Sequence, residues 1–296
     1  MDQPNDDLTR LEGGARAVHR LALAAFPLSV LSLFLAVLLS WGVLALMGAG
    51  IAAVEPRALG PGGVLLEALP DMPLPAPLRT LLSLCLAPVG AGSGPAVFAL
   101  LVFMWFLMAL AMMLPSASPL IRTYCEIADT AARKGERVVH PLVLVAGYLT
   151  VWLIASLGFA GLALVAERFM SQGAVMSPWT GLAGAVVLAI AGLYQFSALK
   201  EACLVKCRNP FTTLFGRWST RPRAIYRLGL QQGLWCFGCC WALMLVMFAV
   251  GMMNVFWMAL LGVFTIVEKS GHSRLFTRIS GVTLLVWALA LLVISI

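Results

Sequence analysis

Long apolar stretches with almost no charge recur along the chain from Leu21 to Ile296, and short connections carrying the charged residues separate them. Each stretch has about 18 residues or more, which is enough for one helix to cross the hydrocarbon core of a bilayer. The pattern therefore predicts an all-α fold. The protein is expected to be a polytopic helical membrane protein, whose helices cross the bilayer several times.

About seven transmembrane helices are expected, near residues 21–50, 97–120, 141–166, 180–203, 228–251, 252–267 and 279–296. The block Leu228–Val267 is about twice as long as one bilayer-crossing helix. We expect it to break at Gly251–Asn254 into the fifth and sixth spans. Pro115 lacks a backbone N–H and should kink or end the second span close to its own position.

Basic residues are abundant in every second connection between the apolar stretches and scarce in the others. Of the 20 Lys and Arg residues, only Arg57, Arg79 and Arg168 lie outside the N-terminal lead and the connections 121–140, 200–227 and 268–278. The positive-inside rule then places the N-terminus in the cytoplasm and the C-terminus outside. Because the basic residues lie in connections and form no basic-aromatic face, the pattern argues against nucleic-acid binding.

This topology gives a simple domain organisation. Residues 1–20 form a cytoplasmic N-terminal segment, and residues 21–296 form a single transmembrane domain with an external Pro/Gly-rich connection at about 55–96. The first apolar run is too long for the core of a cleavable signal peptide, so we expect a retained first helix. The composition agrees with this class, since 61% of the residues are hydrophobic and only 11% are charged.

Cysteine is concentrated in one part of the chain. Five of the 7 cysteines lie between positions 203 and 240; they are Cys203, Cys207, Cys236, Cys239 and Cys240. On a helix, Cys236 and Cys240 share one narrow stripe with Met244 and Met247. Cys203 and Cys207 are four residues apart, so both face one way. The charge census puts both groups at the cytoplasmic membrane face.

A second sulfur stripe is expected on the second span, where Met104, Met108 and Met112 follow one another at intervals of four, with Met113 adjacent. Thiolate and thioether sulfurs are soft ligands that select Cu(I). We therefore predict a Cu(I) site at the five clustered cysteines, with an intramembrane path formed by Met104, Met108, Met112, Met113, Met244 and Met247.

Charged neighbours are expected to assist the cysteines. Lys200, Lys206 and Arg208 lie beside them in the sequence and would favour thiolate over thiol. Glu201 is a candidate oxygen ligand or counter-charge. Glu268 and Lys269, at the end of the sixth span, are expected to anchor the helix at the membrane interface. The histidines are scattered over the connections and are expected to be solvated.

The packing alternative stays open at this stage. Cysteine often behaves as a small buried hydrophobe, and methionine commonly fills gaps in a core. The isolated Cys85 and Cys125 are assigned to packing on this ground. A methionine stripe by itself is also more often part of a core than a metal path. Only the combination of a cysteine cluster with two such stripes favours a metal.

Taken together, the motifs around Met104–Pro115, Lys200–Pro210, Gly233–Met244, Gly251–Met258 and Glu268–Lys269 resemble those of a bacterial family of metal-binding integral membrane proteins described as copper-chaperone-like. The resemblance covers roughly residues 98–270. It implies a multi-helix protein of the bacterial cytoplasmic (inner) membrane with a copper role, whose partners are the lipid bilayer, the metal ion and a copper-receiving protein or oxidase assembly. This chain has Ser197 and Ala198 where many members have a proline before the lysine.

The leading functional hypothesis is a non-enzymatic membrane protein that holds or passes Cu(I) for delivery to copper enzymes. One alternative is a quinone-linked thiol–disulfide oxidoreductase, because Cys236 and Cys239 have the Cys-x-x-Cys spacing of redox pairs. The predicted cytoplasmic location argues against it, since thiols are kept reduced there. Another alternative is a structural or assembly subunit with no metal, in which the sulfur residues only pack.

Overall fold

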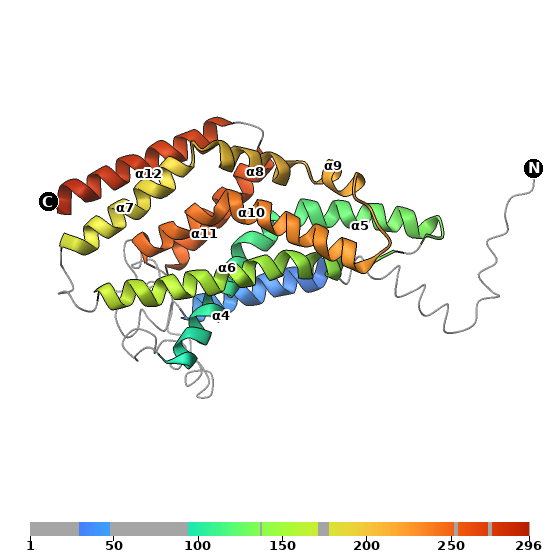
Figure 1. Ribbon diagram of the computed structural model, residues 1–296, viewed down its shortest axis with the longest axis horizontal. Coiled ribbons are helices and arrows are strands. Elements are labelled where there is room, and N and C mark those ends of the chain that lie inside the picture. Colours follow the sequence, from blue (N-terminus) through green and yellow to red (C-terminus); the bar gives the residue numbers. More distant parts are fainter. Residues whose placement is uncertain are drawn as a thin grey trace, which may run out of the picture.

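The computed structural model describes residues 30–47, 94–136, 138–170, 178–251, 254–271 and 274–295, and within these ranges the chain forms helices joined by short turns (Figure 1). The first described helix is Val30–Met47. It is followed by α4 (Pro95–Ser116), α5 (Ser118–Arg133), α6 (Pro141–Met170), α7 (Pro178–Tyr194), α8 (Ala198–Arg208), α9 (Pro210–Phe215), α10 (Pro222–Val250), α11 (Val255–Ser270) and α12 (Arg274–Ser295). The predicted all-α architecture is confirmed over these residues.

Among the described residues, five helices are long and apolar enough to cross a membrane: Val30–Met47, α4, α6, α10 and α12. The segments Gly181–Tyr194 and Ala198–Arg208 make a sixth if this pair, bent by 62°, is one broken span. Each of the seven expected spans has a helix, but α11 has only 16 residues. The number of candidate spans is therefore five or six rather than seven. The membrane orientation stays a prediction, as does the domain division, whose segment 1–20 lies outside the described residues.

Both helix breaks expected from local sequence are confirmed. Helix α4 ends at Ser116, one residue after Pro115. Helix α10 ends at Val250, and the following Gly251 has a φ of 104°, which a residue with a side chain rarely adopts. Asn254 then caps α11 by accepting a hydrogen bond from the Trp257 backbone N–H at 3.3 Å.

Pro115 also explains how the first described helix is held. A proline has no N–H to donate to the carbonyl four residues earlier, so the Ala111 oxygen loses its ordinary helical partner. The indole nitrogen of Trp41 donates to that oxygen at 3.1 Å. A backbone acceptor that the proline leaves free is thus satisfied by a side chain of the neighbouring helix.

Glycines bring α6 and α10 into backbone contact. A Cβ at Gly229 would overlap the Leu144 carbonyl oxygen, and one at Gly233 would lie 2.9 Å from the Val151 Cβ. Since later residues of α6 meet later residues of α10, the two helices run parallel. By the same argument α7 and α12, which lie side by side in Figure 1, run antiparallel, because Gly184 is near Leu291 and the later Gly192 is near the earlier Leu285.

The buried side chains form two clusters. The main core draws its side chains from the helix Val30–Met47 and from α4, α5, α6, α7, α8, α10, α11 and α12. A smaller core joins α5, α9 and the first turns of α6 and α10, and it contains Tyr124, whose hydroxyl donates to the Val139 carbonyl at 2.8 Å. Burial, and secondarily the neighbouring Cys125, raises the pKa of Tyr124.

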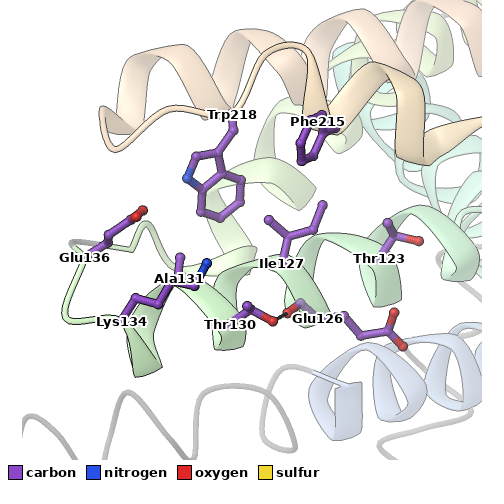
Figure 2. Close-up of a pocket in the computed structure, with 9 residues that line it drawn as sticks. All are labelled: Thr123, Glu126, Ile127, Thr130, Ala131, Lys134, Glu136, Phe215 and Trp218. Carbon is purple, nitrogen blue, oxygen red and sulfur yellow. Dashed lines mark hydrogen bonds between the residues drawn. The ribbon is translucent and has the colours of Figure 1, made fainter.

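A groove of about 560 Å³ lies beside this smaller core, between α5 and the segment that carries Phe215 and Trp218 (Figure 2). Trp218 also contacts the Tyr124 ring, with 5.5 Å between the ring centroids. The lining residues of the groove include neither cysteine nor methionine. It is therefore separate from the sulfur-bearing positions, which lie in the main core.

Candidate metal centre

The sulfur stripe of α10 faces the main core. Cys236, Cys240, Met244 and Met247 are all buried. They lie on one uninterrupted helix, Pro222–Val250. The helical spacing read from the sequence therefore describes a real face of this helix, which points away from lipid and solvent.

The three α10 thiols are in mutual contact. The sulfurs of Cys239 and Cys240 are 3.2 Å apart, and the Cys239 thiol donates to the Cys236 carbonyl oxygen at 3.1 Å. All three side chains are at most 3% exposed. The three residues span five positions of α10, so they lie within little more than one turn of the helix.

The cysteines of α8 pack against α10. Cys203 is buried, and its sulfur lies 2.6 Å from the position that a Cβ would take at Gly238. Cys207 is half-buried, and its thiol interacts with that of Cys239. Gly238 thus lets α8 approach α10 closely at Cys203, and Cys207 reaches Cys239 across the same α8–α10 contact.

A lysine and a tyrosine from two other helices complete the surroundings of Cys236. The Lys269 ammonium of α11 donates to the Cys236 sulfur at 3.0 Å and to the Ser116 hydroxyl at 2.7 Å. The Tyr148 hydroxyl of α6 lies 3.0 Å from the same sulfur and 3.1 Å from the Met113 carbonyl oxygen. The positive charge of Lys269 at this distance stabilises negative charge on that sulfur.

The cations expected from sequence to assist the cysteines contact other groups. Lys200 forms a buried ion pair with the Glu268 carboxylate at 2.9 Å. Arg208 donates to the Glu268 backbone carbonyl at 2.8 and 3.1 Å. Lys206 is exposed, and Glu201 forms an ion pair with Arg274. The cation that contacts a cysteine sulfur is instead Lys269, which the sequence had assigned to the membrane interface.

The expectation that Glu268 and Lys269 anchor α11 at the interface is wrong, because both side chains turn into the protein. Glu268 is 1% exposed. Sequence reasoning missed Lys269, Tyr148 and Ser116 as neighbours of the cysteines. The one available signal was two adjacent charges at the end of an apolar stretch, because a charge kept inside a membrane protein usually has a partner and a role.

The methionines of α4 occupy the same core. Met104, Met108, Met112 and Met113 are buried, and Met112 packs against Gly262 of α11, whose added Cβ would lie 3.6 Å from the Met112 side chain. Helices α4 and α10 run in opposite directions through this core. Tyr148 joins Met113 to Cys236 at one level.

Aromatic rings join α4, α6 and α10 at a second position along the helix axes. Trp105 of α4 is stacked between Phe159 of α6 and Phe248 of α10, with ring centroids 4.8 and 5.1 Å apart. Met104 and Met108 flank Trp105 in α4, and Met247 precedes Phe248 in α10. The two methionine stripes therefore lie at corresponding depths along antiparallel helices.

Within the residues that the structure describes, no three Cys, His, Asp or Glu side chains are arranged to hold one metal ion. The five clustered cysteines, Cys203, Cys207, Cys236, Cys239 and Cys240, are in no disulfide bond. The donor set has the softness that Cu(I) prefers. The contacts among Cys207, Cys236, Cys239 and Cys240 are thus a feature of the fold. That all five thiols bind one ion stays a prediction, and so does the role of the six methionines.

Comparison with known proteins identifies the family. A protein-family model described as PpoB2, copper chaperone, matches residues 102–291, from the first turns of α4 to near the end of α12. The chain belongs to this copper chaperone family. The match includes all eleven residues predicted as ligands, and it confirms the resemblance seen in the sequence motifs. No match was found among curated proteins or among solved structures.

Proposed function

We propose that this member of the copper chaperone family binds Cu(I) at the thiols of the α8–α10 contact and passes it on for delivery to copper enzymes. Cys236, Cys239 and Cys240 would bind the ion from α10, and Cys203 and Cys207 would bind it from α8. The single observation that carries the proposal is the Lys269 ammonium, 3.0 Å from the Cys236 sulfur at the edge of the thiol cluster.

That contact favours metal binding for an electrostatic reason. The thiolate is the form of cysteine that ligates a metal. Two thiolates and one Cu(I) ion carry a net negative charge, which is costly inside a protein unless a cation compensates it. The Lys269 side chain would supply this charge. The Tyr148 hydroxyl would assist when its one proton turns from the Met113 carbonyl to the sulfur.

The methionines suit a weaker, transient role. Thioether sulfur is neutral, so a site built from it would hold Cu(I) less tightly than a thiolate site. Met104, Met108, Met112 and Met113 of α4, with Met244 and Met247 of α10, would provide such positions through the core. On the topology predicted from the charges, this path would lead from the cytoplasmic face, where the thiols lie, into the membrane.

The test uses the full chain purified in detergent and loaded with Cu(I) under anaerobic conditions. Copper per protein is measured by mass spectrometry of the metal after washing with a weak Cu(I) chelator. We expect the double variant Cys236→Ser, Cys240→Ser to lose most of the copper. Cys125→Ser removes a buried cysteine of α5 outside the cluster and should retain it.

Size-exclusion chromatography and circular dichroism show whether each variant remains folded. A folded double variant that retains as much copper as the unmodified chain would contradict the proposal. The same loss in the Cys125→Ser variant would contradict it too, because copper retention would then depend on general integrity of the core rather than on the cluster.

A further inference from the structure

A second polar site lies where the α7–α8 bend meets the start of α12. A pocket of about 660 Å³ opens between these elements. Four cationic side chains line it: Lys200, Arg208, Arg274 and Arg278. Lys200 is paired with Glu268, and Arg274 is paired with Glu201. These two carboxylates balance two of the four cations, so two positive charges remain in excess.

Buried polar atoms in the pocket lining lack partners among the described residues. Both amide atoms of Gln195 and the hydroxyl oxygen of Thr277 are buried without a hydrogen bond. Gln195 is 4% and Thr277 is 8% exposed. Since buried polar groups are nearly always hydrogen-bonded, two donors beside an excess of positive charge indicate a ligand with acceptor oxygens and negative charge.

The local backbone adds to this character. Ser197 caps α8 by accepting from the Lys200 backbone N–H at 3.1 Å, so the N-terminus of that 11-residue helix lies in the pocket lining. The N-terminal end of a helix carries partial positive charge and favours anions, phosphate groups in particular.

The surroundings indicate where the anion comes from. Phe196 and Val205 line the same pocket and are 48% and 47% exposed. The pocket adjoins Arg274, the first residue of the candidate span α12, and the bend of the candidate broken span. Basic pockets between transmembrane helices near the membrane surface are suited to lipid headgroups. We propose that this pocket binds an anionic phospholipid through its headgroup phosphate.

The test uses the full chain in detergent micelles and native mass spectrometry, with phosphatidylglycerol, phosphatidylcholine of the same acyl chains, and inorganic phosphate as probes. We expect phosphatidylglycerol to be retained in preference to phosphatidylcholine. Arg278→Gln should reduce this retention about fivefold, as expected for one cation near a headgroup. The control Arg223→Gln removes one positive charge from a separate basic surface and should leave retention unchanged.

Thr277→Val provides a second test that does not alter charge. It should weaken retention of phosphatidylglycerol, while the lipid-free protein becomes no less stable, because the variant removes a buried hydroxyl that has no partner. Equal retention of the two lipids would overturn the proposal, and so would equal losses in Arg278→Gln and Arg223→Gln. Binding of inorganic phosphate with no lipid retained would overturn it as well, by assigning the pocket to a soluble anion.

Discussion

The ammonium nitrogen of Lys269 lies 3.0 Å from the sulfur of Cys236, although 33 positions separate the two residues in the chain. The contact joins the end of α11 to the middle of α10, beside the sulfurs of Cys239 and Cys240. It makes the cysteine cluster a charged site rather than an apolar patch of the core, and the first prediction rests on it.

Replacing Lys269 by methionine should weaken Cu(I) retention about tenfold or more, because a hydrogen bond to a charged group contributes about 1.5–3 kcal/mol. Competition with a Cu(I) chelator measures the change. Lys206→Met is the matched control, since it removes an exposed lysine of α8 that is close to Cys203 and Cys207 in sequence. If both variants bind Cu(I) like the unmodified chain, Lys269 has no role in binding.

The buried ion pair between Lys200 and Glu268 should be needed for stability. Glu268→Gln leaves the Lys200 ammonium, 1% exposed, without its counter-charge. Removing one partner of such a pair costs about 3–5 kcal/mol. Thermal unfolding in detergent should show a large decrease for Glu268→Gln and a partial recovery when Lys200→Met is added.

The exposed pair Arg122–Glu126 serves as the comparison, with side chains 77% and 57% exposed. Glu126→Gln should change stability by less than about 1 kcal/mol. If Glu268→Gln and Glu126→Gln lower the thermal stability equally, the buried pair is no more important for stability than an exposed one.

Gly229 should be essential for the packing of α6 against α10. An alanine there would place its Cβ against the Leu144 carbonyl oxygen, and backbone cannot move aside as a side chain can. We expect Gly229→Ala to destabilise the protein by about 1–3 kcal/mol, as overpacking does. Gly158→Ala, in α6 with no atom within 4 Å of the added Cβ, should be neutral or stabilising. Thermal unfolding of both variants is the measurement, and a similar decrease for the two would contradict the argument.

Tyr124 should make the smaller core sensitive to alkali. Its pKa is raised in the folded protein, so the folded state holds the phenol proton more tightly than the unfolded chain does. The contribution of Tyr124 to the free energy of unfolding is fully present below pH of about 10, the ordinary tyrosine pKa. This contribution decreases as the pH rises above that value. Tyr124→Phe should therefore be less stable at neutral pH, where it loses the hydrogen bond to Val139, and should lose less stability on going from pH 9 to pH of about 11. Parallel pH profiles of the two proteins would refute this.

Local rules predicted much of the fold. The end of α4 follows from Pro115, and the break between α10 and α11 follows from Gly251, because each residue imposes a backbone restriction that needs no tertiary contact. The bend at Gln195–Ser197 has neither proline nor glycine, so local rules do not predict it within the expected span 180–203. Its geometry depends on packing, since a Cβ added to Gly281 of α12 would clash with the Phe196 ring.

The candidate site shows the same division. Helical periodicity predicted the shared face of Cys236 and Cys240, because spacing within one helix determines direction. It could not predict that Lys269 contacts this face, or that Lys200 pairs with Glu268 instead of a cysteine. Those contacts depend on which helices are neighbours and on their relative height, and neither is encoded in the spacing within one span.

The hydrogen bond from Trp41 to Ala111 links two positions that share no helix. Proline at 115 creates an acceptor, and an indole at 41 satisfies it. In hydrocarbon, where water cannot substitute, a free carbonyl costs several kcal/mol. Relatives that lack the proline have no such acceptor to fill, so a donor at position 41 gives them no advantage. Positions 41 and 115 should therefore vary together during evolution. In an alignment of relatives, this covariation would indicate the contact between the first helix and α4.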